Sequence, residues 1–325
     1  MRSNYPNGLT DGMTVRGLPL SVSHPGEIFW VNNSTVLSKG GVGGSDGNDG
    51  SYRRPWSTID YAIGRCTAGR GDIIMVMPGH AESIVASAGI TLDVDGVAII
   101  GLGVGNYRPS ITYTTANTAR ISWTADSCTM KGIRFVGNFL SIATAILNSG
   151  GRDWTIEDCA FSDTSAILGL LACVTTTVST NSDNGYFANN TRSSDATTTP
   201  GTAIVVANTT NRLTIKGNTF WHSVIEENIP VVLSHGALVV DELLMDDNII
   251  YSVNAAQTTE GLLIKTSATT GSGIICRNFV RSVDPSAFIM VTATAVQYGM
   301  FENYHTGETT LLSGLILPAV ATDSS

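Results

Sequence analysis

Three pairs of adjacent carboxylates are the residues of this sequence best suited to acid–base chemistry. They are Glu157-Asp158, Asp246-Asp247 and Glu226-Glu227. Two carboxylates about 5–10 Å apart can act as acid and base, or as acid and nucleophile, when a glycosidic bond is hydrolysed. The first two pairs occupy equivalent places in a repeat, three repeats apart, which is roughly 14 Å at the spacing of stacked strands. That is too far for one catalytic pair, so we expect surface ion pairs; Glu226-Glu227 falls in a loop and could line a groove.

The other short motifs favour turns over binding sites. The stretch "SDGNDG" (45–50) places oxygen ligands at short spacing, as calcium loops do, but lacks the spacing and the closing Glu of an EF-hand. We expect an ordinary Asp/Asn/Gly turn there. Arg70-Gly71-Asp72 precedes an apolar strand and is expected to be a turn by chance.

The histidines and cysteines show no metal-binding spacing, so we expect no metal, no cofactor and no catalytic residue among them. The five cysteines are widely separated among apolar residues, which predicts reduced thiols in a core and synthesis in a cytoplasm. The residues concerned are His24, His80, His222, His235, His305, Cys66, Cys128, Cys159, Cys173 and Cys276.

Composition and charge exclude several classes of partner. The chain has 325 residues and a net charge of −9. An acidic surface without a basic stripe argues against nucleic acid as a partner. There is no basic amphipathic helix for a membrane surface. The most apolar stretch, "AILGLLACV" (166–174), is too short to span a bilayer, and the N-terminus has no apolar signal region.

The elements that must position these side chains belong to a repeat. Each copy has an apolar residue, an anchor three residues later, and a second apolar residue two places after the anchor, as in Ile215, Asn218 and Phe220. "AIIGLG" (98–103) resembles an earlier copy with its anchor at Leu102. The other anchors follow at steps of 25 to 31 residues, and five of them are Asn. They are Ile133, Cys159, Asn190, Asn218, Asn248, Asn278 and Asn303.

A repeat of this length, built from short alternating strands and without amphipathic helices, predicts a parallel β-helix. Inward residues alternate within a strand, so residues three apart both face inward only across a corner. Asn tolerates a left-handed backbone, and we expect the anchor to adopt it at that corner. The stacked Asn side chains should hydrogen-bond from coil to coil, each bond contributing about 1 kcal/mol.

Charges next to the anchors support the same register. Aligning the copies places Lys131 beside Glu157 and Lys216 beside Asp246. The neighbouring column places Asp247 beside Arg277 and Arg277 beside Glu302, so no like charges are adjacent. Opposite charges on neighbouring strands are the pairing expected of a sheet in this register.

The two ends of the chain differ from the repeat. Residues 1–50 are predicted to be an N-terminal arm and a Gly-rich linker. Residues 1–25 are rich in Pro, Gly and Asn and are expected to be an extended arm that orders on a partner surface, with a disordered tail as the alternative. Residues 38–50 are the Gly-rich linker. Residues 51–325 form the β-helix domain. Ser57 or Thr58 should cap a short helix through Ile63 that covers the first coil. The apolar C-terminal residues, from 311 onward, should cover the last coil; the alternative is that they mediate contact between subunits.

The residues of the entry region resemble a known family. The stretches "GSDGNDGSYRRPWSTIDYAIG" and "GDIIMVMPGHAESI", followed by "VAIIGLG", resemble right-handed parallel β-helix, pectin-lyase-like proteins. More narrowly, residues 26–110, about a quarter of the chain, are similar to β-helix proteins encoded among tailed-phage virion genes. The resemblance implies a homotrimer on the virion that decorates or cements the capsid, with the major capsid protein as partner.

Two alternatives to a structural virion protein stay open. One is a tail-spike-like polysaccharide hydrolase or lyase. "SHGA" (234–237) is similar to the His-Gly of polygalacturonases, but Asp246-Asp247 follows His235, which is not the order of that family. The other is a glycan-binding protein that uses exposed aromatics, with host-surface glycans as ligands; aromatic stacks inside the coils would explain the same residues. The candidates are Trp221, Tyr251 and Tyr304, and the apolar segment 165–180 is expected to be a side wall or subunit contact.

Overall fold

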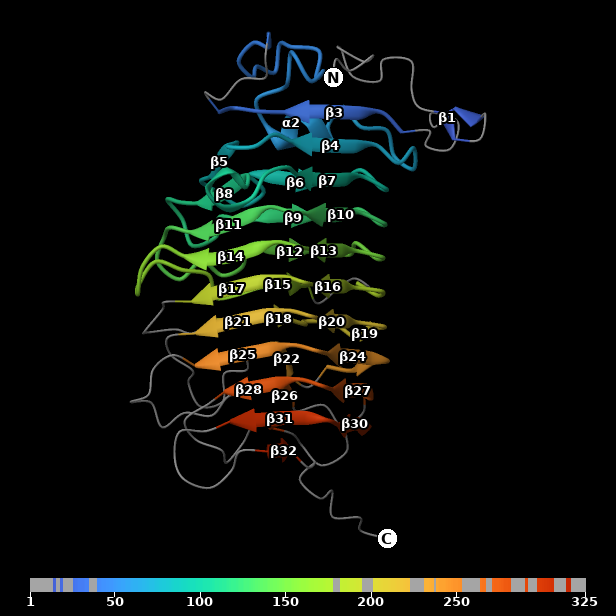
Figure 1. Ribbon diagram of the computed structural model, residues 1–325, viewed down its shortest axis with the longest axis vertical. Coiled ribbons are helices and arrows are strands. Elements are labelled where there is room, and N and C mark those ends of the chain that lie inside the picture. The colour runs from blue at the N-terminus through green and yellow to red at the C-terminus, as the bar shows by residue number, and fades with distance from the viewer. Residues whose placement is uncertain are drawn as a thin grey trace, which may run out of the picture.

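The chain folds into a right-handed parallel β-helix whose strands stack in three sheets (Figure 1). The computed structural model describes residues 14–15, 18–19, 26–34, 40–177, 182–194, 201–222, 231–236, 238–252, 264–266, 271–281, 290–291, 297–306 and 314–316. Within these ranges the only helices are α2 (Ile59–Ile63) and the 3₁₀ helix η1 (Gly105–Tyr107). The predicted all-β class and solenoid architecture are confirmed.

Sheet I contains ten strands, one from each successive coil, and all its pairings are parallel. In order along the solenoid they are β3 (Ile28–Val31), β4 (Ile73–Val76), β7 (Ala98–Gly101), β10 (Thr129–Lys131), β13 (Thr155–Glu157), β16 (Tyr186–Ala188), β20 (Thr214–Lys216), β24 (Leu243–Asp246), β27 (Ser272–Cys276) and β30 (Gln297–Phe301).

Sheet II also contains ten strands and follows sheet I around each coil. Its last strand pairs antiparallel with the one before it. The strands are β5 (Ala81–Ile84), β8 (Ser110–Tyr113), β11 (Arg134–Gly137), β14 (Ala160–Asp163), β17 (Thr191–Ser194), β21 (Thr219–His222), β25 (Ile249–Ser252), β28 (Phe279–Arg281), β31 (Asn303–Thr306) and β32 (Gly314–Ile316).

Sheet III closes each coil with eight strands. Two further two-stranded sheets pair β1 with β2 and β19 with β23. The bounds are β6 (Ile90–Leu92), β9 (Ile121–Trp123), β12 (Ile146–Asn148), β15 (Ala172–Thr176), β18 (Thr202–Val205), β22 (Leu233–Gly236), β26 (Ile264–Thr266), β29 (Met290–Val291), β1 (Thr14–Val15), β2 (Leu18–Pro19), β19 (Thr210–Asn211) and β23 (Val240–Asp241).

The register of sheet I confirms the sequence repeat. Met130 pairs with Ile156, and Ile215 pairs with Met245, so each copy stacks on the next as aligned. Ile99 pairs with Met130, which confirms "AIIGLG" as an earlier copy. Two further strands, β3 and β4, precede this copy in the sheet. The coil of β3 was missed, because the segment that carries α2 separates β3 from β4. Strand β3 lies inside the stretch 1–50, so the sheet begins within the predicted arm and linker.

The Asn anchors form a continuous internal hydrogen-bonded ladder, as predicted. Asn218 donates from its backbone N and from Nδ2 to Asn248 Oδ1, at 3.1 and 2.9 Å. Asn248 makes the same two bonds to Asn278, at 3.0 and 2.9 Å. The ladder continues to Asn303 at one end and to Asn190 and the backbone N of Cys159 at the other.

The left-handed backbone at the corner was assigned to the wrong residue. For the seven anchors from Ile133 onward, the residue with positive φ is the one before the anchor, not the anchor itself. Placing the left-handed residue one step earlier turns the chain so that the anchor side chain points into the coil, where it can reach its stacked neighbours. These residues are Gly132 (φ 71°), Asp158 (51°), Asn189 (55°), Gly217 (65°), Asp247 (56°), Arg277 (53°) and Glu302 (53°).

The interior is filled by stacked apolar side chains, and α2 closes its N-terminal end. Phe135 and Phe161 stack at 4.8 Å between ring centroids. Ile59, Ala62 and Ile63 are the buried face of α2, which packs against β3, β4 and β6. The helix begins as predicted, with its Thr58 N-cap hydroxyl accepting from Tyr61 N, and ends at Gly64.

The described cysteines are free, and four of the five are buried, as expected. Burial raises the pKa of the Cys159 thiol to about 12 and that of Cys173 to about 11. Such thiols stay protonated near neutral pH and are poor nucleophiles. Among the residues described, no helix is long and apolar enough to cross a membrane.

Candidate functional site

The predicted carboxylate pairs of sheet I form ion pairs on its outer face. Lys131 Nζ lies 2.9 Å from Glu157 Oε2, and Lys216 Nζ lies 3.0 Å from Asp246 Oδ2. Both pairs were predicted from the aligned columns. The third was assigned to the wrong acid, because Arg277 reaches Asp246, at 2.5 Å, and not Asp247. The corner turns Asp247 away from the strand, so the guanidinium folds back onto the strand residue beside it.

Asp246 is the most enclosed of these acids, with its side chain 2% exposed between two cations. Burial opposes ionisation, but the bonds from Lys216 and Arg277 outweigh it and hold the pKa of Asp246 below its ordinary value. A carboxylate held ionised in this way serves the fold and is unsuited to be a general acid.

Replacing Arg277 by Met should destabilise the protein modestly. Asp246 would keep Lys216, and both cationic side chains are about half exposed, so we expect a loss of about 1–2 kcal/mol in the free energy of unfolding. Equilibrium unfolding in urea measures it. Glu302→Gln serves as the control, because the register places Glu302 beside Arg277, as aligned, while the ion pair of Arg277 is with Asp246. A larger loss in the control than in Arg277→Met would contradict this assignment.

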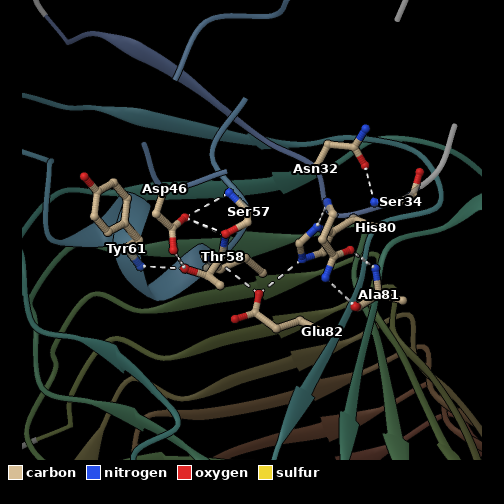
Figure 2. Close-up of polar contacts among 11 residues, drawn as sticks. Asn32, Ser34, Asp46, Ser57, Thr58, Tyr61, His80, Ala81 and Glu82 are labelled. Atoms are coloured by element: carbon tan, nitrogen blue, oxygen red, sulfur yellow. Dashed lines mark hydrogen bonds and ion pairs between the residues drawn. The ribbon is translucent and has the colours of Figure 1, made fainter. Parts of the chain in front are cut away.

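A second polar cluster lies at the N-terminal end, where β3, α2 and β5 meet (Figure 2). His80 is 1% exposed, and its Nδ1 accepts from the backbone N of Asn33 at 3.1 Å. The proton of the neutral ring therefore resides on Nε2, which donates to Glu82 Oε2 at 3.1 Å. The same Glu82 oxygen accepts from Ile59 N, the first helical residue of α2.

Asp46 completes this cluster on the other side of the helix start. Its Oδ1 accepts from Ser57 N at 2.9 Å and from Ser57 Oγ at 2.7 Å, as Figure 2 shows. Asp49 accepts from Ser51 N. The carboxylates of the 45–50 stretch thus bind backbone and hydroxyl donors, as in the turn expected there. The cluster fixes loop, helix and strand, and we assign it a structural role.

Two other sequence motifs are buried structural features. Asp72 of the Arg70-Gly71-Asp72 stretch is 0% exposed, accepts from Glu27 N and Thr67 N, and pairs with Arg70 at 2.7 Å. His235 of "SHGA" is 1% exposed, and its Nδ1 donates to Leu238 O at 2.7 Å. Burial lowers the pKa of His235. This enclosed position does not support a polygalacturonase-like role for His235.

Aromatic side chains on neighbouring strands form a ladder on the outer face of sheet II. Trp221 is 46% exposed and pairs with Tyr251, their ring centroids 5.3 Å apart. Tyr251 contacts Phe279 at 6.2 Å, and Phe279 pairs with Tyr304, which is 48% exposed. We call Trp221, Tyr251, Phe279 and Tyr304 the aromatic ladder. It lies on four successive strands, β21, β25, β28 and β31 (Figure 1).

Sequence reasoning named three members of this ladder but could not place them, and it missed Phe279. The structure puts the rings on the outer face, not inside the coils. The signal was present, because Phe279 and Tyr304 each follow an anchor by one residue, while Trp221 and Tyr251 follow by three. One and three places after an inward anchor are both outward positions of the next strand.

Sheet II also lacks acidic residues on its outer face. Alternation along β5 to β31 identifies the outward positions, and none of those described is Asp or Glu. The charged residues among them are two arginines, in a chain of net charge −9. The positions are Ala81, Ser83, Ser110, Thr112, Arg134, Val136, Ala160, Ser162, Thr191, Ser193, Thr219, Trp221, Ile249, Tyr251, Phe279, Arg281 and Tyr304.

Several predictions fall outside the described residues. These are the loop pair Glu226-Glu227, His24, most of the arm 1–25 beyond the β1–β2 hairpin, and the C-terminal cap after 316. Of the apolar segment 165–180, residues 172–176 form β15, a side wall of the coil as expected. Among the residues that are described, no group of three or more His, Cys, Asp or Glu could hold a metal ion.

Comparisons with known proteins find likeness of architecture. No model of a protein family matches the chain, and no curated protein matches it. Among solved structures it is similar to a rhamnogalacturonan lyase, with 12% identity over 79% of this chain and 74% of that chain, TM-score 0.44. It is similar to a pectin methylesterase from Aspergillus niger, with 14% identity over 88% and 94%, TM-score 0.48. It is also similar to a pectate lyase, with 17% identity over 85% and 70%, TM-score 0.43. The chain is a right-handed parallel β-helix protein, and its strand register is what establishes this class.

Proposed function

We propose that this chain is a structural protein of a tailed-phage virion. It decorates or cements the capsid exterior as a homotrimer and is anchored there through its N-terminal arm. The resemblance of residues 26–110 to virion β-helix proteins supports the proposal. The observation that carries it is the outer face of sheet I, which is neutral, carries apolar side chains at both ends, and suits burial against another protein.

The charges of the two outward columns of this face cancel within the chain, and Arg277 of the neighbouring corner also binds Asp246. Its two outward columns carry two lysines and two carboxylates in their middle section, and each lysine is bound to a carboxylate. Exposed apolar side chains lie at the ends: Ile28 is 49% exposed, and Ile274 and Phe301 are 44% and 45% exposed. Interfaces between permanent partners are more apolar than other surfaces, and paired charges avoid repulsion between identical copies.

The mechanism of such a protein is mass action. A ligand that binds only the assembled shell stabilises that shell by an amount that grows with the logarithm of the ligand concentration relative to its Kd. An enzyme would instead need two carboxylates available to one substrate, and the two predicted pairs on sheet I are committed to ion pairs or to corners of the coil. The structural role therefore accounts for more of the described surface.

The test combines sedimentation with shells and measurement of mass. The full chain should sediment saturably with phage capsids stripped of decoration, and light scattering should give three times the chain mass of 34.2 kDa. A variant lacking residues 1–25 should still form a trimer but should no longer bind the shell. The double variant Ile274→Lys/Phe301→Lys should lose the trimer, while Val104→Lys, at a site 78% exposed on another surface, should not. A monomeric full chain that stays in the supernatant would overturn the proposal.

A further inference from the structure

The aromatic ladder is not explained by a structural role on a shell. Trp221 and Tyr304 are each nearly half exposed, although burying a large aromatic ring is strongly favourable. Tyr251 contacts the ring on either side of it, Trp221 and Phe279, so three of the four rings form one continuous row. Nothing in the coil requires aromatic residues at these positions, because the equivalent outward residues of β17 are Thr191 and Ser193.

The rings advance along the axis of the solenoid by one strand per step of about 4.8 Å. Between Tyr251 and Phe279 the row shifts to the neighbouring outward column, because Tyr251 pairs with Arg281 and Phe279 pairs with Ile249. Such a row presents a periodic apolar strip to a linear ligand. The strip is bordered by hydroxyl groups, from Thr191 and Ser193 on β17 and Thr219 on β21. Apolar rings accompanied by a few polar groups are typical of sites that bind small molecules and chains of small units.

A pyranose ring matches both parts of this surface. One face of the ring carries C–H groups, which are attracted to the negative face of an aromatic ring, and its rim carries hydroxyls that donate and accept hydrogen bonds. A protein partner would instead favour a patch that is apolar at its centre and extends in two dimensions. The ladder has one ring on each strand, and the hydroxyls of Thr191, Ser193 and Thr219 continue the same two outward columns, which favours the sugar.

The distribution of charge on sheet II also favours a carbohydrate ligand. The outward positions of sheet II carry no carboxylate, and Arg281 stands in the column of Trp221 and Tyr251. An acid-free strip on a chain of net charge −9 is a place where both neutral and acidic sugars can approach without repulsion.

We propose that the aromatic ladder is a binding site for a carbohydrate chain that lies along the solenoid axis, with successive pyranose rings against Trp221 and Tyr251. Binding here needs no hydrolysis and does not depend on the virion role. The two proposals can be tested separately, because the protein could bind the shell without binding sugar, or bind sugar without binding the shell.

The experiment uses the full chain on an array of defined oligosaccharides that includes neutral glucans, N-acetylhexosamine polymers and uronic acid polymers. A positive oligosaccharide is then titrated in solution while tryptophan fluorescence is followed, because Trp221 is the most exposed of the described tryptophans. Trp221→Ala and Tyr251→Ala should each weaken binding at least about tenfold, as truncation of a central aromatic contact does. Tyr107→Ala, at a tyrosine 61% exposed away from the ladder, is the matched control and should bind as the unaltered chain does.

Three results would overturn the inference. They are no binding to any array member at millimolar concentration, full binding by the Trp221→Ala/Tyr251→Ala double variant, and equal loss in the Tyr107→Ala control. Trp221→Phe is the control for misfolding of Trp221→Ala. It keeps an aromatic ring on β21 and should therefore retain most of the affinity for the oligosaccharide. A fall in the mass of the ladder variants by light scattering would assign the row to contact between copies instead, and would also overturn it.

Discussion

Replacing Asn248 by Leu should destabilise the protein by about 4–6 kcal/mol. The substitution keeps the volume of the side chain but removes four buried hydrogen bonds. Two come from Asn218 to Asn248 Oδ1, one goes to Ile215 O and one to Asn278 Oδ1. The backbone N of Asn218 is left buried without an acceptor, and an orphaned buried donor costs about 1–3 kcal/mol in addition to the lost bond.

Equilibrium urea unfolding, followed by circular dichroism, measures this loss. The matched control is Asn117→Leu, an exposed asparagine outside the ladder, which should change stability by less than about 0.5 kcal/mol. Asn303→Leu, at the end of the ladder, should cost less than Asn248→Leu, because it removes three such bonds and interrupts no onward contact. If Asn248→Leu and Asn117→Leu unfold at the same urea concentration, the ladder does not contribute as we argue.

Stability should fall as the pH drops below about 6.5, and His222→Phe should remove much of that fall. His222 is 0% exposed, and neither ring nitrogen has a hydrogen-bond partner among the residues that the structure describes. Burial, with Arg192 adding to it, holds the pKa of His222 well below its ordinary value. The unfolded chain therefore binds a proton below about pH 6.5 that the folded chain does not, and each such histidine costs about 1.4 kcal/mol per pH unit.

His235, whose pKa burial also lowers, contributes with the same sign. At pH 7 and above both histidines are neutral in both states and the term vanishes. The carboxylates with lowered pKa values, such as Asp72, Asp126 and Asp246, add their own loss only near and below pH 4. Between pH 6.5 and 4.5, the loss of stability caused by the histidines can therefore be measured apart from the loss caused by the carboxylates.

The measurement is the free energy of unfolding against pH for the unaltered chain and for His222→Phe. The variant should be more stable at pH 7, because it removes two unpartnered buried nitrogens, and its slope below pH 6.5 should be about half as steep. His80→Phe is the control, since it breaks the bonds to Asn33 and Glu82 and should destabilise at every pH. If the free energy of unfolding of His222→Phe depends on pH below 6.5 as steeply as that of the unaltered chain, groups other than His222 cause the loss of stability in acid.

Much of the fold could be predicted because a solenoid repeats its local rules. The spacing from Ile215 to Asn218 to Phe220 recurs with Met245, Asn248 and Ile250, and pairing in register is the arrangement that buries every copy. The Thr58 cap and the Lys131–Glu157 and Lys216–Asp246 pairs followed from the same local reasoning. The coil of β3 escaped it, because a long insertion separates this strand from β4.

The repeat period, the strand register, the Asn ladder and the cap helix were determined by the sequence itself, because each depends on spacing along the chain. The tertiary structure decided which corner residue turns left-handed, which acid Arg277 reaches, and that Trp221 and Tyr251 face outward. Those outcomes depend on how far the backbone rotates at each corner. A rotation of one residue exchanges the inner and outer faces of a strand, and only the packed coils determine it.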